Sequence, residues 1–230
     1  MVPPNLSAYP LCSYFLSGYL CKTADPTNFP EDQLPDLLDR HERLLRSVLQ
    51  ILGVTKESVK SKSEFNFDSG NAANFEAGIA MFRVVQALHL KGFVNIAFVT
   101  PIKNAPSADL TCERNGHKVC VEVKAVTKQS KGCPELLIEE QLGPKILDSI
   151  SKAREQLKAT ATRLHCKVKI FACVVNWFDQ SMHLDQNDYQ HIVNRLEHDG
   201  SFKGVDGVLF VTKMGQRFLF LNEAGKCIDC

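Results

Sequence analysis

The sequence predicts an α/β protein in which a central mixed sheet is flanked by helices. Segments with apolar residues at helical spacing alternate with short β-rich runs, in the order helix, three strands, helix, strand. The dipeptide Asn115-Gly116 is a strong hairpin signal, and it lies between two of the expected strands. A chain of 230 residues is long enough to bury one core of this kind.

The first third of the chain is expected to be helical after an irregular lead-in. Residues 1–30 mix prolines and aromatic residues without a clean period, so no element is predicted there. Leucines at helical spacing predict a helix that starts near Pro35 and ends before Gly53. A polar connector, 55–71, follows. A second helix is expected over about 72–90, with an apolar stripe made of Phe75, Ile79, Phe82, Val85 and Leu88.

The remaining two thirds supply the sheet. We expect a strand within 93–100, a hairpin within 107–126, a long helix from Lys145 to His165, and an apolar strand within 167–178. A polar, partly helical segment at 184–199 and a closing hairpin at 204–221 complete the order. The predicted organisation is an N-terminal helical extension at 1–66, a core at 67–180, and a C-terminal extension at 181–230 that completes the same domain.

Composition excludes several classes of protein. The chain is 44% hydrophobic and 23% charged, which is typical of a soluble globular protein, and its net charge of +1 means that any site for a polyanion must be local. No apolar run is long enough for a membrane span, and no basic region precedes the apolar stretch at 11–21, so we expect neither a membrane partner nor a signal peptide. The nine cysteines are expected to be reduced thiols of a cytoplasmic protein. Cys227 and Cys230 have metal-ligand spacing but lack a second pair, so whether they bind metal stays open.

The Asn115-Gly116 turn predicts which residues of the hairpin face each other. If these two residues form the loop, the numbers of paired residues sum to 231, so Glu113 faces Lys118 and Asp109 faces Glu122. The Cβ atoms of such a pair lie about 4.5–5.5 Å apart. Alternation along the second strand gives a core face of Val119, Val121 and Val123, and an opposite face of Lys118, Cys120, Glu122 and Lys124.

Two directly opposed carboxylates destabilise a sheet unless something compensates their charge. One interpretation is that Asp109 and Glu122 point into solvent and that Lys124 pairs with Glu122. The other is that they hold a divalent cation, since Mg²⁺ typically uses one or two protein carboxylates together with water and substrate phosphate. The sequence therefore identifies a candidate metal site on this hairpin.

The pattern of an acid, a gap of twelve residues and then Glu-X-Lys on the next strand resembles that of the PD-(D/E)XK superfamily, the restriction-endonuclease-like nucleases. The resemblance covers about residues 70–178. Asp109 matches the first acid, Glu122 the second and Lys124 the lysine, and Glu76 matches an additional acid that many members carry in the preceding helix. The chain departs from the pattern at Ala108, where the motif has proline, although this position varies in such families. It also has Thr160, rather than tyrosine, four residues after Gln156, so the Gln-Tyr motif of the RecB-like branch is incomplete.

The resemblance implies a restriction-endonuclease-like core with the order helix–β–β–β–helix–β. It implies a metal-dependent nuclease that hydrolyses phosphodiester bonds, most readily a DNA endonuclease, with Mg²⁺ or Mn²⁺ as cofactor. Asp109, Glu122 and the backbone carbonyl of Val123 would be metal ligands, and Lys124 would lie beside the attacking water. Glu76 would hold a second ion or a metal-bound water, although it can equally be a surface residue of its helix.

Binding of nucleic acid needs cations along the backbone of the substrate. The candidates for nucleic-acid contacts are Lys128, Lys145, Lys152 and Gln156, although a solvated helix face explains the lysines equally well. A homodimer is compatible with such an enzyme. The alternative function is a non-catalytic nucleic-acid-binding or scaffold domain with the same fold. No GxSxG, Walker A, GxGxxG or HExxH motif occurs, so triad hydrolases, nucleotide-binding folds and zinc proteases have no support.

Overall fold

The computed structural model describes residues 6–23, 34–62, 72–103, 105–126, 138–175, 194, 202–212 and 215–220. The chain divides into two compact units, residues 1–91 and 92–230. The predicted core begins at residue 67, so the last helix of the first unit belongs to the predicted core. Each unit is described by itself below.

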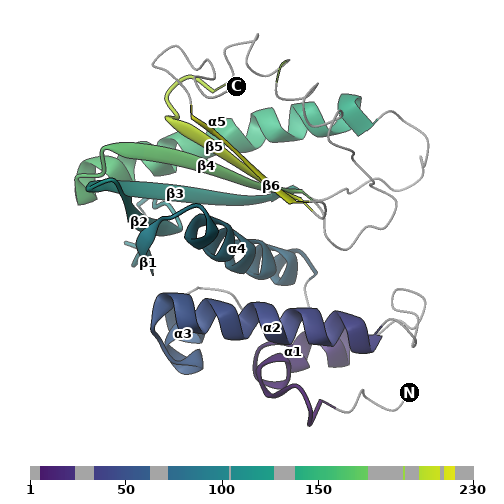
Figure 1. The fold of residues 1–230 in the computed structure, drawn as a ribbon. Helices are drawn as coiled ribbons and strands as arrows, with labels where there is room; N and C mark the ends of the chain where they lie inside the picture. The colour runs from purple at the N-terminus through teal and green to yellow at the C-terminus, as the bar shows by residue number, and fades with distance from the viewer. Residues whose placement is uncertain are drawn as a thin grey trace. The chain divides into compact units, whose positions relative to one another are not determined.

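The first unit is helical throughout its described residues. It contains α1 (Pro10–Thr23), α2 (Leu34–Leu52), α3 (Lys56–Lys62) and α4 (Ala72–Leu90) (Figure 1). The bounds of α2 and α4 confirm the two helices that the leucine and phenylalanine spacing predicts. Of the predicted stripe on α4, Ile79, Phe82, Val85 and Leu88 are buried, and the side chain of Phe75 lies outside the described residues. Helix α4 packs against α2, and Phe15 of α1 meets Phe82 edge to face.

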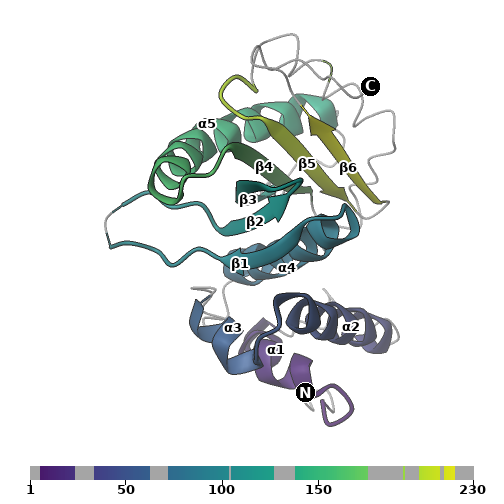
Figure 2. The same cartoon turned by 60° about the vertical axis from the view of Figure 1, so that its left-hand side comes forward.

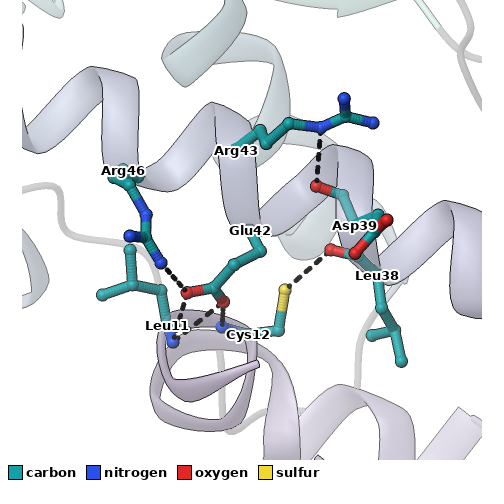
Figure 3. Close-up of polar contacts among 7 residues, drawn as sticks. All are labelled: Leu11, Cys12, Leu38, Asp39, Glu42, Arg43 and Arg46. Atoms are coloured by element: carbon teal, nitrogen blue, oxygen red, sulfur yellow. Dashed lines mark hydrogen bonds and ion pairs between the residues drawn. The ribbon is translucent and has the colours of Figure 1, made fainter. Parts of the chain in front are cut away.

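The prediction of an irregular lead-in was wrong for Pro10–Thr23, which form α1. The reason is a long-range helix cap (Figure 3). The carboxylate of Glu42, a buried residue of α2, accepts hydrogen bonds from the backbone N–H of Leu11 at 3.0 Å and of Cys12 at 2.9 Å. These are amides of the first turn, which have no partner inside their own helix. Because the capping group comes from a residue 30 positions away, no local pattern reveals it.

Helix α3 lies inside the segment that the sequence predicts as a polar connector. Thr55 caps it, accepting a hydrogen bond from the N–H of Ser58 at 3.3 Å, and Val59 is its buried residue. Lys56 places its ammonium 4.6 Å from the centre of the Tyr14 ring of α1. A short, mostly polar helix of this kind depends on such tertiary contacts rather than on its own propensity.

The second unit contains a mixed sheet with a long helix against it. The strands are β1 (Val94–Phe98), β2 (Leu110–Arg114), β3 (His117–Val126), β4 (Val168–Val175), β5 (Gly207–Thr212) and β6 (Gly215–Phe220), and their order in the sheet is their order in the chain. The pairs β3–β4 and β4–β5 are parallel, and the other pairs are antiparallel. Helix α5 (Ile138–Leu164) packs against β3 and β4 (Figure 2). The predicted α/β class with a mixed sheet is confirmed.

Helix α5 begins earlier than the sequence predicts. Proline favours the first turn of a helix, which placed the expected start at Lys145, directly after Pro144. The helix instead begins at Ile138 and continues through Pro144. The missing N–H of proline removes one intrahelical hydrogen bond, and the helix nevertheless runs for 27 residues. The predicted segment at 184–199 lies outside the described residues apart from Asn194, which is helical, and so do Trp177 and the pair Cys227 and Cys230.

The predicted hairpin register is confirmed. Pairs from Leu110–Val121 to Arg114–His117 all follow the predicted sum, and Asn115 and Gly116 have φ angles of 50° and 75°. Positive φ at both central residues is the requirement of a type I′ turn, and glycine meets it without strain. Glu113 lies opposite Lys118, but its carboxylate accepts a hydrogen bond from Asn95 Nδ2 at 2.8 Å, and no described ion pair joins it to Lys118.

Strand β3 is buried on both faces. Val119, Val121 and Val123 are buried, as the predicted core face requires. The opposite face is buried as well, because Cys120 packs in a hydrophobic cluster with residues of α5, β4 and β5. Glu122 shares that face. Four cysteines, Cys112, Cys120, Cys166 and Cys173, are expected from the sequence to lie in strands as small apolar residues. Cys112, Cys120 and Cys173 are free and buried in strands, whereas Cys166 is free, partly buried and lies between α5 and β4. Among the helices described, none is long and apolar enough to cross a membrane.

Candidate functional site

The sheet fixes the backbone of Asp109 on both sides. Asp109 directly precedes β2, and its N–H donates to the carbonyl of Val121 on β3 at 3.1 Å. Its own carbonyl accepts from the N–H of Val99, which follows β1, at 2.9 Å. The regular pairing of the hairpin ends at Leu110–Val121. Because the N–H of Asp109 donates to Val121, which is already the partner of Leu110, Asp109 does not continue that register, and its direct opposition to Glu122 stays a prediction. The two side chains are nevertheless close enough for the charge of Asp109 to act on Glu122.

The carboxylate of Asp109 is held by the same strand that carries Glu122. Its Oδ2 atom accepts a hydrogen bond from the N–H of Val123 at 2.7 Å, and the residue is half-buried. A carboxylate bonded to the backbone in this way has one preferred orientation, which aims it at the neighbourhood of Glu122 and Val123.

Glu122 is a fully buried acid, and the cation beside it is Lys124. Its Oε1 atom lies 2.5 Å from Lys124 Nζ, and the Lys124 side chain is 30% exposed. The carboxyl of Glu122 also lies within interaction range of the Asp109 side chain. Burial, followed by the charge of Asp109, raises the pKa of Glu122 to about 8, and Lys124 opposes that rise. The solvated interpretation of this acid from the sequence is therefore wrong, although its pairing with Lys124 is confirmed.

The arrangement fits a hard divalent cation. With a pKa of about 8, Glu122 keeps its proton near neutral pH when no cation is bound, and a divalent cation would favour the ionised form that can act as a ligand. Within the described ranges, no group of three or more His, Cys, Asp and Glu side chains could hold a metal ion. The candidate site offers fewer than three such side chains as metal ligands. It consists of the two carboxylates, with a main-chain carbonyl such as that of Val123 as the remaining protein ligand, and Mg²⁺ is commonly bound by few protein ligands and several waters.

Helix α5 supports the site through the two residues that precede Asp109. Gln156 Nε2 donates to the carbonyl of Ser107 at 3.1 Å, and the hydroxyl of Thr160 accepts from the N–H of Ala108 at 2.7 Å. The sequence pointed to Gln156 but passed over Thr160, which it noted only as a missing tyrosine. The available signal was its spacing of four residues from Gln156, which places both on one face of the helix.

The predicted nucleic-acid contacts have mixed outcomes. Gln156 turns inward to Ser107, as described above. Lys152 is exposed and lies 2.7 Å from Asp148 one helical turn away, so its charge is partly compensated. Lys128 lies outside the described residues, and of Lys145 the structure describes the helical backbone but not the side chain. These lysine contacts stay predictions.

Glu76 is not brought together with the other candidate residues by the described structure. It belongs to α4 in the first unit, whereas Asp109, Glu122 and Lys124 belong to the second, and its side chain lies outside the described residues. Its place in the site stays a prediction.

Comparison with known proteins gives no match: no family model, no curated protein and no solved structure is similar to this chain.

Proposed function

We propose that this chain is a divalent-metal-dependent nuclease that hydrolyses phosphodiester bonds in nucleic acid, with DNA as the preferred substrate and endonucleolytic action. The observation that carries the proposal is the fully buried Glu122, which lies close enough to Asp109 to be affected by its charge and has Lys124 as the neighbouring cation. A buried acid pair is expensive in a protein that has no use for it.

The order of elements supports the same proposal. The chain runs α4, β1, β2, β3, α5, β4, which agrees with the helix–β–β–β–helix–β order of restriction-endonuclease-like cores. Asp109 precedes the second strand of this series, and Glu122 and Lys124 lie on the third. We propose a restriction-endonuclease-like core on this basis, and a fold alone would not carry the activity.

Each candidate side chain has a task in this chemistry. The carboxylates of Asp109 and Glu122, with the carbonyl of Val123, would hold Mg²⁺ or Mn²⁺. Such an ion supplies an activated water and charge stabilisation on the phosphate. Lys124 now forms an ion pair with Glu122 and opposes the rise in its pKa. Once the charge of that carboxylate is balanced by an ion, the ammonium of Lys124 can donate to a water or to a phosphate oxygen. Glu76 would hold a second ion or a metal-bound water, and Lys128, Lys145 and Lys152 would contact the substrate backbone.

The test is cleavage of supercoiled plasmid and of single-stranded DNA with Mg²⁺, with Mn²⁺ and with EDTA. We expect cleavage only with a divalent ion, and a loss of about 100-fold or more for Glu122→Gln and Lys124→Met, since the first removes a charge that would hold the ion and the second removes a charge that would act at the reacting phosphate. Lys118→Met is the matched control, because Lys118 is an exposed lysine on the same strand and face. Cleavage that survives both Glu122→Gln and Lys124→Met would refute the proposal.

A second experiment measures metal binding without substrate, from the effect of the ion on the melting temperature. Asp109→Asn keeps an oxygen that can accept from Val123 N–H but removes the charge, so the metal-free variant should melt no lower than the parent. An ion with an assumed dissociation constant of about 1 mM, present at about 10 mM, stabilises the parent by roughly 1.4 kcal/mol, and the variant should lose most of this gain. If Asp109→Asn strongly destabilises the metal-free protein and keeps the metal response, the acid pair is structural and the scaffold alternative gains support.

A further inference from the structure

The segment that leads into Asp109 is held by one face of α5. Two successive residues are involved: the carbonyl of Ser107 accepts from Gln156 Nε2, and the N–H of Ala108 donates to Thr160 Oγ1. The second of these bonds is 2.7 Å long and joins two buried groups. Thr160 is fully buried and Ala108 is nearly so. Loss of either partner would leave the other without its hydrogen bond in the interior, which is the costly case.

A third residue of α5, Arg163, binds both ends of the segment that connects β1 to β2. Arg163 donates through Nη1 to the carbonyl of Thr100 at 3.4 Å and through Nη2 to the hydroxyl of Ser107 at 3.2 Å. These two acceptors are the ends of the connection, which Figure 2 shows as a long excursion from the sheet between β1 and β2. The path of the chain into Asp109 is therefore set by α5 as well as by the strands.

The Ala108–Thr160 bond needs both of its residues. Ala108 supplies a backbone donor that proline at this position would lack, and Thr160 supplies the hydroxyl that accepts.

We infer that Thr160 is a positioning residue for Asp109. Its hydroxyl fixes the Ala108 peptide, and this in turn fixes where the Asp109 carboxylate lies relative to Glu122. The inference rests on the proposed function, since it concerns the spacing of the two proposed metal ligands. Groups that orient metal ligands without touching the metal typically change affinity or activity by about 10-fold to 100-fold when they are removed.

The test uses the full chain and Mn²⁺ as the probe. Thr160→Val keeps the shape of the side chain and removes the hydroxyl. We expect the Mn²⁺ concentration that gives half of the maximal rise in melting temperature to increase about 10-fold. Thr160→Ser restores the hydroxyl and should return that concentration to within about twofold of the parent. Thr162→Val is the matched control, because Thr162 is exposed on the same helix and its hydroxyl donates to the carbonyl of Lys158.

A second variant tests the bond from the other side. Ala108→Pro removes the donor and leaves α5 untouched, so it also serves if Thr160→Val does not fold. Thr160→Val leaves the N–H of Ala108 without its acceptor, and Ala108→Pro leaves the hydroxyl of Thr160 without its donor. The double variant removes both groups, so neither is left without a partner. The shift in the Mn²⁺ midpoint should therefore be no larger in the double variant than in the worse single variant, because the two groups act as one pair.

The outcomes separate the two proposals. If the parent shows neither a Mn²⁺-induced rise in melting temperature nor cleavage, the proposed function fails and the inference fails with it. If the parent responds to Mn²⁺, and Thr160→Val lowers the melting temperature but leaves the Mn²⁺ midpoint within twofold of the parent, Thr160 is structural only. That result would overturn the inference and leave the proposed function standing.

Discussion

At the scale of single residues, the most informative group is Glu122, because its carboxyl is buried, whereas an acid on a surface hairpin would be exposed to water. It lies fully buried on the α5 face of β3, between the apolar Cys120 and the ammonium of Lys124. Charges of this kind are tolerated in interiors when they are paired or when they bind a cation. This one residue turns a common sequence pattern into a specific chemical hypothesis.

The raised pKa of Glu122 predicts how stability depends on pH. The pKa is about 8 in the folded protein and about 4.5 as the ordinary value, so between these pH values the folded state binds the additional proton. The free energy of unfolding should therefore fall as pH rises from about 4.5 to about 8, by at most about 1.4 kcal/mol per pH unit from this group. Denaturant unfolding in EDTA at several pH values measures the slope.

The variant Glu122→Gln isolates this contribution, because it removes the titrating group and keeps the shape. The comparison is needed because other groups titrate in the same range. Burial lowers the pKa of His41 to about 4, so His41 makes the folded state more stable as pH rises from about 4 to about 6.5. We expect the parent to lose stability relative to Glu122→Gln as pH rises. A difference that stays flat from pH 5 to pH 8 would show that Glu122 titrates normally.

At the scale of elements, the sequence predicted those helices and strands whose signals are local. The spacing of apolar residues predicts the bounds of α2 and α4 and the valine face of β3. The residues of the turn predict its type I′ geometry and the hairpin register. Helices α1 and α3 were missed because what stabilises them comes from elsewhere in the chain: the carboxylate of Glu42 caps α1, and α3 contacts Tyr14 of α1. Local propensity is a weak guide when tertiary contacts decide.

The cap of α1 predicts a measurable loss of stability. Glu42→Ala removes the acceptor for the N–H groups of Leu11 and Cys12. We expect a loss of about 1–2 kcal/mol in the free energy of unfolding, together with reduced helical signal by circular dichroism. Glu42→Gln keeps an acceptor and should lose less. Glu57→Ala is the control, since Glu57 is an exposed acid in the first turn of α3. Equal losses for Glu42→Ala and Glu57→Ala would argue against the cap.

The candidate site shows the same division between local and non-local information. Asp109, Glu122 and Lys124 could be named from the sequence because a two-residue turn fixes their pairing. The burial of Glu122 could not, because it depends on where α5 packs. Spacing places Thr160 on the same helix face as Gln156, but its partner and that of Arg163 could not be predicted, since Ala108 and Ser107 lie 52 and 56 positions away.

At the scale of the whole molecule, the described structure separates a helical unit from the unit that holds the candidate site. Asp109, Glu122, Lys124 and the supporting face of α5 all belong to residues 92–230. An ion that binds this site stabilises the folded form of that unit directly. Local opening in proteins occurs in contiguous cooperative units, so stabilisation at one site does not spread uniformly.

Hydrogen exchange in the presence of Mg²⁺ tests this organisation. For amides that exchange by opening of the second unit, about 10 mM Mg²⁺ and an assumed dissociation constant of about 1 mM predict exchange roughly 10-fold slower in β2, β3 and α5. Amides of α2 should exchange at an unchanged rate. Asp109→Asn is the control, in which Mg²⁺ should slow neither set. If Mg²⁺ slows α2 and β3 equally in the parent, the two units open together.

The type I′ turn at Asn115-Gly116 affects how related sequences can be recognised. Five paired residues separate each acid from the turn, 110–114 on one side and 117–121 on the other, and this equality is what predicts that the acids face each other. A longer loop at the turn itself would leave these arms equal and the acids opposed, whereas one extra residue in a single arm would shift the pairing and turn one acid to the other face. Related chains can therefore differ in the number of residues between the acids and still keep the pair. Equality of the two arms, rather than a fixed gap of twelve, is the feature by which distant relatives should be recognised.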